Sequence, residues 1–372
     1  MRNILVVGLS MVALGACQLA ALPPANDATE GRGASSLFSP GALTVMTRSL
    51  SLNASPERVW ESPSADQVPS RAAEWLSTLR QEDVSARARA LADEIQYARP
   101  HLLGLQQVAQ VRLQSPGDAI FGGTSPAQAL QVDLLPMLLG ELESRGLHYR
   151  EVARVQNSDV EVPLRTSATP TYDDVRLTDF DVILVRSDVG VSGVRGGNYL
   201  ARREVSAPGL GRMTLPRGWV SLEAEVHGRH YRFVSTHLEP APGEEGLRVQ
   251  LAQASELIDS LRGETLPVVL VGDFNTPANL GLVGAPTYRE LLLAGYVDVW
   301  TRRPGTTLAV MPLATRRNLV LVRSPVTPGP RQVGPVLAYG VGNARPEWRF
   351  GPWRTELGGV VARLRMPPTP RN

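Results

Sequence analysis

Two segments of the chain end in polar side chains of the kinds that act on phosphoesters. The apolar run 268–271 is followed by Gly272, Asp273, Phe274 and Asn275, and the run 231–236 is followed by His237. An aspartate can bind a metal or activate water, while asparagine and histidine can donate hydrogen bonds to phosphate oxygens. Because open α/β sheets commonly bind ligands at the carboxyl ends of their strands, these residues predict a phosphoester site. The alternative is structural: Asp273 and Asn275 could cap their own turn.

The elements that must position these residues alternate between strand and helix. Apolar and β-branched runs predict strands over 42–48, 101–108, 147–155, 181–186, 219–226, 230–236, 267–272, 318–322 and 359–364. Helical spacing predicts helices over 85–99, capped by Ser85, and 126–144, with a possible interruption at Pro136 and an end at Gly146. Further helices are predicted over 246–261 and 287–294. This alternation, with a hairpin across Gly228, predicts an α/β sandwich with helices outside the sheets.

Together, the THLE and GDFN segments resemble the endonuclease/exonuclease/phosphatase superfamily, and the resemblance extends from about Leu43 to about Arg365. It implies a four-layer α/β/β/α sandwich with two mixed sheets. It also implies attack of water on a phosphoester, with Mg²⁺ or Mn²⁺ neutralising the phosphate and a histidine oriented by an aspartate. The implied partner is a phosphorylated small molecule, a lipid head group or a nucleic acid. A formal net charge of +2 gives no strong basic field for duplex nucleic acid.

Five positions depart from the motifs of that superfamily. Ser49 stands where the first strand carries an asparagine, and Gln107 stands where the second strand ends in the metal-binding glutamate. Asn318 replaces the aspartate that orients the catalytic histidine, and Leu357 replaces that histidine. Glu356, a weak candidate metal ligand, stands where the metal-side aspartate is expected. His237, Asp273 and Asn275 match the motifs and are the expected catalytic residues.

The departures fit one another physically. Without its histidine, an orienting aspartate would be a buried charge lacking a partner, and Asn318 removes that charge at constant shape. Gln107 likewise relieves repulsion among carboxylates that hold no metal. The sequence therefore predicts a catalytically impaired member that binds a phosphorylated ligand, with Mg²⁺ or Mn²⁺ as cofactor if it is active and otherwise the option of none.

Two alternatives remain. One is an active enzyme with Mg²⁺ or Mn²⁺, in which a carboxylate of Asp159, Glu161, Asp179 or Asp181 serves as a substitute ligand. The other is a structural surface lipoprotein without a ligand. The pair Arg316 and Arg317 could clamp phosphate or could simply be solvated.

The N-terminus has the features of a bacterial lipoprotein signal. A short apolar run, 4–14, leads into Leu14, Gly15, Ala16 and Cys17, so we expect a signal peptide over 1–16 and lipidation of Cys17. Residues 17–40 are predicted to form a flexible tether, 41–367 one domain and 368–372 a disordered tail. With no aspartate after Cys17, the expected location is the cell envelope, on the outer membrane. An ordinary signal peptide or a short anchor helix is the alternative.

Overall fold

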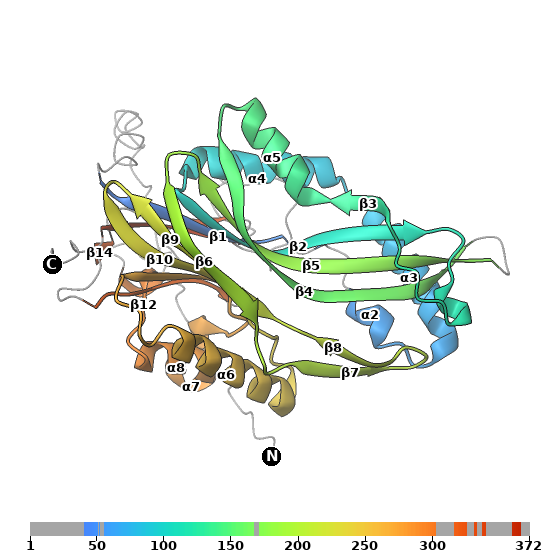
Figure 1. Cartoon of the computed structure of the whole chain (residues 1–372). Coiled ribbons are helices and arrows are strands. Elements are labelled where there is room, and N and C mark those ends of the chain that lie inside the picture. The colour runs from blue at the N-terminus through green and yellow to red at the C-terminus, as the bar shows by residue number, and fades with distance from the viewer. Residues whose placement is uncertain are drawn as a thin grey trace, which may run out of the picture. The chain divides into compact units, whose positions relative to one another are not determined.

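Two mixed β-sheets lie face to face in the computed structural model (Figure 1). The structure describes residues 41–50, 52, 56–166, 171–302, 316–325, 331–332, 337–339 and 359–365. All of them belong to the unit Ser39–Asn372. The predicted signal peptide, tether and tail lie outside the described residues, so those predictions are not tested.

The larger sheet is built around the parallel pair β1 and β2, and it has the order β14-β16-β1-β2-β5-β4. Two further strands, β3 and β15, pair with β2 and β16. The strands are β1 (Leu43–Ser49), β2 (Leu102–Gln114), β3 (Ala129–Asp133), β4 (Tyr149–Arg165), β5 (Tyr172–Arg186), β14 (Arg331–Gln332), β15 (Leu337–Tyr339) and β16 (Gly359–Arg365).

The smaller sheet has the order β12-β13-β11-β10-β9-β6, with only β10 and β11 parallel. Its strands are β6 (Gly190–Asn198), β9 (Gly218–Val226), β10 (Arg229–His237), β11 (Val268–Asp273), β12 (Val297–Asp298) and β13 (Asn318–Arg323). A separate hairpin joins β7 (Arg203–Ala207) to β8 (Gly211–Leu215). The predicted hairpin across Gly228 is confirmed as the β9–β10 pair.

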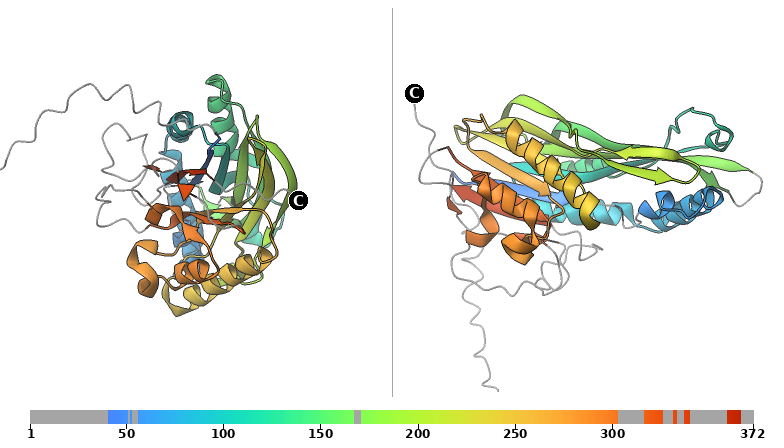
Figure 2. Two further views of the ribbon diagram at one scale, coloured as in Figure 1. Left: turned by 90° about the vertical axis from the view of Figure 1, so that its left-hand side faces the viewer. Right: turned by 90° about the horizontal axis from the view of Figure 1, so that it is seen from below.

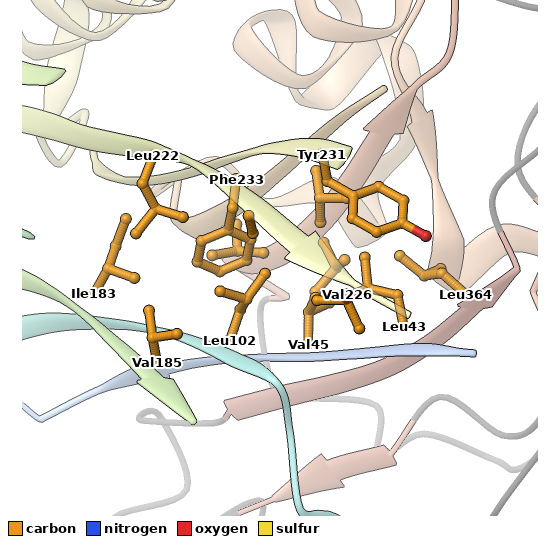
Figure 3. Packing of buried hydrophobic residues seen from close by; sticks show 14 of the residues in the cluster. Leu43, Val45, Leu102, Ile183, Val185, Leu222, Val226, Tyr231, Phe233 and Leu364 are labelled. Atoms are coloured by element: carbon orange, nitrogen blue, oxygen red, sulfur yellow. The ribbon is translucent and has the colours of Figure 1, made fainter. Parts of the chain in front are cut away.

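The main core lies between the two sheets. Leu102 and Ile183 of the larger sheet face Leu222 and Phe233 of the smaller one, and all four are fully buried (Figure 3). Because side chains alternate across a strand, the opposite faces of the same strands are free to pack against helices. The near-continuous apolar run of β11 follows from burial on both faces.

Helices cover the outer faces and complete four layers (Figure 2). On the larger sheet lie α4 (Val84–Ala98) and α5 (Leu134–Ser144), and on the smaller sheet lie α6 (Gly243–Ser260) and α8 (Pro286–Leu293). The predicted four-layer sandwich is therefore correct. The remaining α-helices are α2 (Glu57–Trp60), α3 (Val68–Arg80) and α7 (Gly281–Gly284). None of the helices in the described ranges is long and apolar enough to cross a membrane.

Two helix starts differ from prediction. Helix α4 is capped by Asp83, which accepts from the backbone N–H of Ala86 at 2.7 Å, and not by Ser85. The segment predicted as one helix over 126–144 is strand β3 followed by α5, whose cap is Asp133. Pro136 therefore lies in the first turn of α5, where its missing N–H has no partner to lose, and it does not interrupt the helix.

Candidate active site

Three polar residues lie side by side at the ends of three neighbouring strands in the smaller sheet. This end of the sheet, where β10 and β11 finish and β13 begins, is called the His237 edge. His237 ends β10 directly beside Asp273 at the end of the parallel strand β11, and Asp273 faces Asn318 at the start of the antiparallel strand β13. All three are buried. Antiparallel pairing places the start of one strand beside the end of its neighbour, which is why residues far apart in sequence meet here.

The GDFN turn is held by its own side chains. Asp273 accepts from the backbone N–H of Asn275 at 3.0 Å, and the Asn275 amide donates to the carbonyl of Leu238 at 2.8 Å. Asn275 has a φ of 49°, a conformation that asparagine tolerates better than most residues. The capping roles are therefore present, and they leave the Asn275 Oδ1 atom facing the guanidinium of Arg317 at 3.4 Å.

Two of the substituted positions contact each other where β1 ends beside a bulge in the middle of β2. The Oγ of Ser49 donates to Oε1 of Gln107 at 2.6 Å. Gln107 sits in a bulge with a φ of 57°, and its backbone N–H lies 3.4 Å from Oδ1 of Asp181. Asp181, on β5 of the larger sheet, lies 3.9 Å from Nδ1 of His237. The two sheets thus meet at this edge through Asp181 and His237.

An arginine that the sequence analysis did not single out lies at the centre of the site. Arg217, just before β9, donates through Nε to Glu239 at 3.0 Å, and its Nη1 lies 3.6 Å from Oδ2 of Asp179. The same Nη1 is 3.2 Å from Nδ1 of His237. Because a guanidinium only donates, His237 Nδ1 must accept, so the imidazole is neutral and carries its proton on Nε2.

Comparison with known proteins identifies the family. The model of the endonuclease/exonuclease/phosphatase family matches residues 77–340. The chain belongs to this family. No protein among the curated sequences gave a match.

A solved structure of an endonuclease/exonuclease/phosphatase protein shares the fold, and two further solved structures align with lower TM-scores. A family protein from Beutenbergia cavernae is 17% identical, with a TM-score of 0.53, covering 89% of this chain and 73% of its own. A humanized D. rerio TDP2 is 14% identical (TM-score 0.46), covering 88% of this chain and all of its own. A mannosyl-6-phosphatase from Bacteroides thetaiotaomicron is 15% identical (TM-score 0.44), covering 87% of this chain and all of its own.

Burial at these strand ends shifts the pKa values of the titratable groups in the candidate site. Burial, followed by the nearby Arg217 and Arg317, lowers the pKa of His237 well below its usual range. Burial raises the pKa of Asp179 to about 6 against the opposing effect of Arg217. Burial and the neighbouring Asp179 raise the pKa of Asp181 well above its usual value. The site at neutral pH therefore holds a neutral imidazole beside fixed guanidinium charge.

Enzymes of the endonuclease/exonuclease/phosphatase family typically depend on a divalent metal. In the described part of the chain, no three His, Cys, Asp or Glu side chains are placed to hold one metal ion. Gln107 offers a neutral oxygen that already accepts from Ser49, and the carboxylates of Asp179 and Glu239 already face Arg217. These three groups are therefore engaged with protein donors, whereas Oδ2 of Asp181 has no hydrogen-bond partner among the described residues. The predicted use of Mg²⁺ or Mn²⁺ remains a prediction, because Glu356 lies outside the described residues.

The structure separates the predicted residues into three sets. His237, Asp273 and Asn275 come together with Asn318, and Ser49 and Gln107 join them through Asp181. Two of the proposed substitute ligands have other partners: Asp159 pairs with Arg176 at 2.5 Å, and Glu161 accepts from the backbone N–H of Ala127 at 3.0 Å. The predicted positions of Leu357, Glu356 and Cys17 are outside the described ranges.

Proposed function

We propose that this chain is a family member that binds a phosphorylated ligand at the His237 edge and has an impaired ability to hydrolyse it. The observation that carries this proposal is the 2.6 Å hydrogen bond between Ser49 and Gln107. It uses the amide oxygen at the position where the family motif places a metal-binding carboxylate. The ligand would be a phosphorylated small molecule, a lipid head group or a nucleic acid. A lipid on Cys17 would anchor the protein to the envelope membrane.

The state of Asn318 supports the same proposal. Its Oδ1 atom is buried and finds no hydrogen-bond partner among the described residues. A carboxylate there would orient an imidazole, whereas the sequence has Leu357 at the expected imidazole position. Losing a general base typically reduces the rate by about 10²–10⁴-fold. Ligand binding would persist, because it depends on hydrogen-bond donors and on charge that do not require that base.

One observation favours a second candidate, an active phosphoesterase. Asp181 lies 3.9 Å from His237, and Asp179 is on the same strand two residues away. These two carboxylates are the only proposed substitutes among the described residues that reach the site network. If Asp179 and Asp181 bind a metal once a substrate is present, the wild-type protein would hydrolyse a phosphoester.

Reversion of the substituted positions tests the proposal. We would compare the full-length wild-type protein with a variant carrying Ser49→Asn, Gln107→Glu, Asn318→Asp and Leu357→His, using a chromogenic phosphodiester with Mg²⁺ or Mn²⁺. We expect the variant to be faster by orders of magnitude. Wild-type turnover at ordinary enzymatic rates, about 1–10³ per second, would instead establish the active alternative. The double variant Gln81→Glu and Gln131→Glu, at two exposed positions, controls for the two added negative charges.

A further inference from the structure

Two arginines flank the His237–Asp273 pair within the sheet, one before the strand that neighbours β10 and one before the strand that neighbours β11. Arg217 immediately precedes β9, which pairs with β10, and Arg317 immediately precedes β13, which pairs with β11. Both pairs are antiparallel, so the beginnings of β9 and β13 lie at the edge where β10 and β11 end. The strand order β13-β11-β10-β9 therefore places one guanidinium on each side of the pair.

Arg317 is a cation without a carboxylate partner in the described part of the chain. No ion pair within 4.0 Å involves it there, and its Nη1 contacts only the neutral amide oxygen of Asn275, at 3.4 Å. The side chain is partly exposed. Its charge still reaches the site, since it acts on the pKa of both His237 and Asp273. A guanidinium in this state has unused donors beside a buried imidazole.

The neighbouring Arg316 is in a different situation. It forms an ion pair with Asp298 at 2.7 Å, and its guanidinium lies 5.6 Å from the ring of Trp300 and 5.8 Å from that of Tyr288. Through these contacts, Arg316 links the start of β13 to Asp298, Trp300 and Tyr288, so its guanidinium is already engaged within the protein. Of the adjacent pair Arg316 and Arg317, only Arg317 has no ion-pair partner among the described residues and can offer its guanidinium to a ligand.

Arg217 supplies the fixed half of the arrangement. Glu239, fully buried, holds its Nε at 3.0 Å, and this contact orients the guanidinium while its Nη1 reaches His237. That contact also leaves the proton of His237 on Nε2, as a third donor. Three donors of this kind match the oxygens of a phosphoryl group.

We propose that Arg217 and Arg317 form a guanidinium clamp that binds a terminal phosphoryl dianion, the group of a phosphomonoester, without any divalent metal. This inference rests on the proposed phosphate-binding function and specifies its ligand class. A phosphomonoester carries about −1.5 to −2 charges at pH 7 and three terminal oxygens. A phosphodiester carries one charge and two such oxygens, so the clamp discriminates against it. Arg317 brings the positive charge that no described carboxylate balances, whereas Arg217, already paired with Glu239 and Asp179, contributes oriented N–H donors.

The test uses methyl phosphate and dimethyl phosphate as matched probes. Each would be titrated into the full-length protein in detergent at low ionic strength, once with EDTA and once with MgCl₂. We expect methyl phosphate to bind with the same Kd in both, and dimethyl phosphate to bind at least about tenfold more weakly. Arg317→Gln should weaken methyl phosphate binding by roughly tenfold or more, with partial recovery in Arg317→Lys. Arg289→Gln, an exposed arginine paired with Glu290, should bind as the wild type does.

Each other outcome overturns a distinct statement. Binding by the wild type that Arg317→Gln leaves unchanged removes the clamp and keeps the proposed function. Binding that requires Mg²⁺ also removes the clamp, and it favours the active phosphoesterase. Equal affinity for both esters removes the dianion preference. A wild-type protein that binds neither ester under any condition removes the proposed function itself. Arg217→Gln serves as a second variant, read only where circular dichroism shows a folded protein.

Discussion

The Oγ of Ser49, at the end of β1, and the Oε1 of Gln107, at the bulge within the parallel strand β2, are joined by a 2.6 Å hydrogen bond. Both side chains are neutral, and the hydroxyl of Ser49 donates to the amide oxygen of Gln107. A glutamate at position 107 would accept the same bond but would bring a charge to within reach of Asp181, whose carboxyl contacts the backbone N–H of the same residue. The pair therefore stabilises this edge without an ion.

Restoring a single carboxylate should make this edge responsive to metal. In Gln107→Glu without divalent ions, we expect a loss of about 1 kcal/mol in the free energy of unfolding, because a partly buried charge gains no cation. Addition of Mn²⁺ should recover stability by mass action, about 2.7 kcal/mol at a hundred times its Kd. Thermal and urea unfolding with and without MnCl₂ measure both effects. An identical response of the wild type to MnCl₂ would show that position 107 does not control metal binding.

Gly272 allows the ends of β10 and β11, which carry His237 and Asp273, to lie close together. A Cβ at this position would lie 2.0 Å from the carbonyl oxygen of Thr236, a backbone atom of β10 that cannot turn away. We expect Gly272→Ala to cost about 1–3 kcal/mol or more and to displace His237 from Asp273. Urea denaturation measures the cost. Gly140→Ala is the matched control: a Cβ there meets nothing within 4 Å, and alanine in a helix should gain about 0.5–1 kcal/mol.

The sequence predicted the strand ends that come together in the candidate site, but not all of the charges around them. Strand ends carrying His237 and Asp273 could be read locally, because an apolar run that stops at a polar residue marks its own boundary. Arg217 could not be found in that way. Its importance comes from Glu239 and Asp179, which reach it through tertiary pairing of β9 with β10 and contact between the two sheets. Its position just before a predicted strand was the only local signal.

Helix boundaries also depend on tertiary contacts that the local sequence does not reveal. Ser85 and Asp83 are both good caps, and the choice of Asp83 follows from where the chain enters the helix rather than from residue type. The apolar spacing over 129–133 is compatible with strand or helix when the run is short. The segment forms strand β3 because it pairs with β2. Helix α3 was not predicted, although Trp75, Leu76 and Leu79 lie at helical spacing on its buried face.

The envelope location can be tested through one atom. Cys17 is the only cysteine of the chain and the expected site of lipidation. Cys17→Ser in cells should move the protein from the membrane fraction to the soluble fraction, because the acyl chains contribute about 0.8 kcal/mol per buried CH₂. Fractionation and immunoblotting measure this shift. Continued membrane association of the variant would instead support an uncleaved anchor helix over the first residues.

Stability at acidic pH should depend on His101, at the start of β2. Its Nδ1 accepts from the backbone N–H of Thr44 at 3.0 Å, so the folded state needs a neutral ring. Burial, then the charges of Arg186 and His227, lower the pKa of His101 to about 4. The unfolded chain, with a pKa near 6.5, binds the proton first as pH falls. Stability is thus complete above about pH 6.5 and decreases toward pH 4, by up to roughly 3 kcal/mol.

Replacing the ring isolates this contribution. In His101→Gln, the free energy of unfolding should change less between pH 6.5 and pH 4 than in the wild type, because no proton is taken up at this position on unfolding. His148→Gln is the matched control, since that imidazole is 59% exposed and pairs only with Glu143 among the described residues. Chemical denaturation at half-unit pH steps measures the slopes. If His101→Gln and His148→Gln have the same slope as the wild type, His101 is not the group that sets the acid limit of this fold.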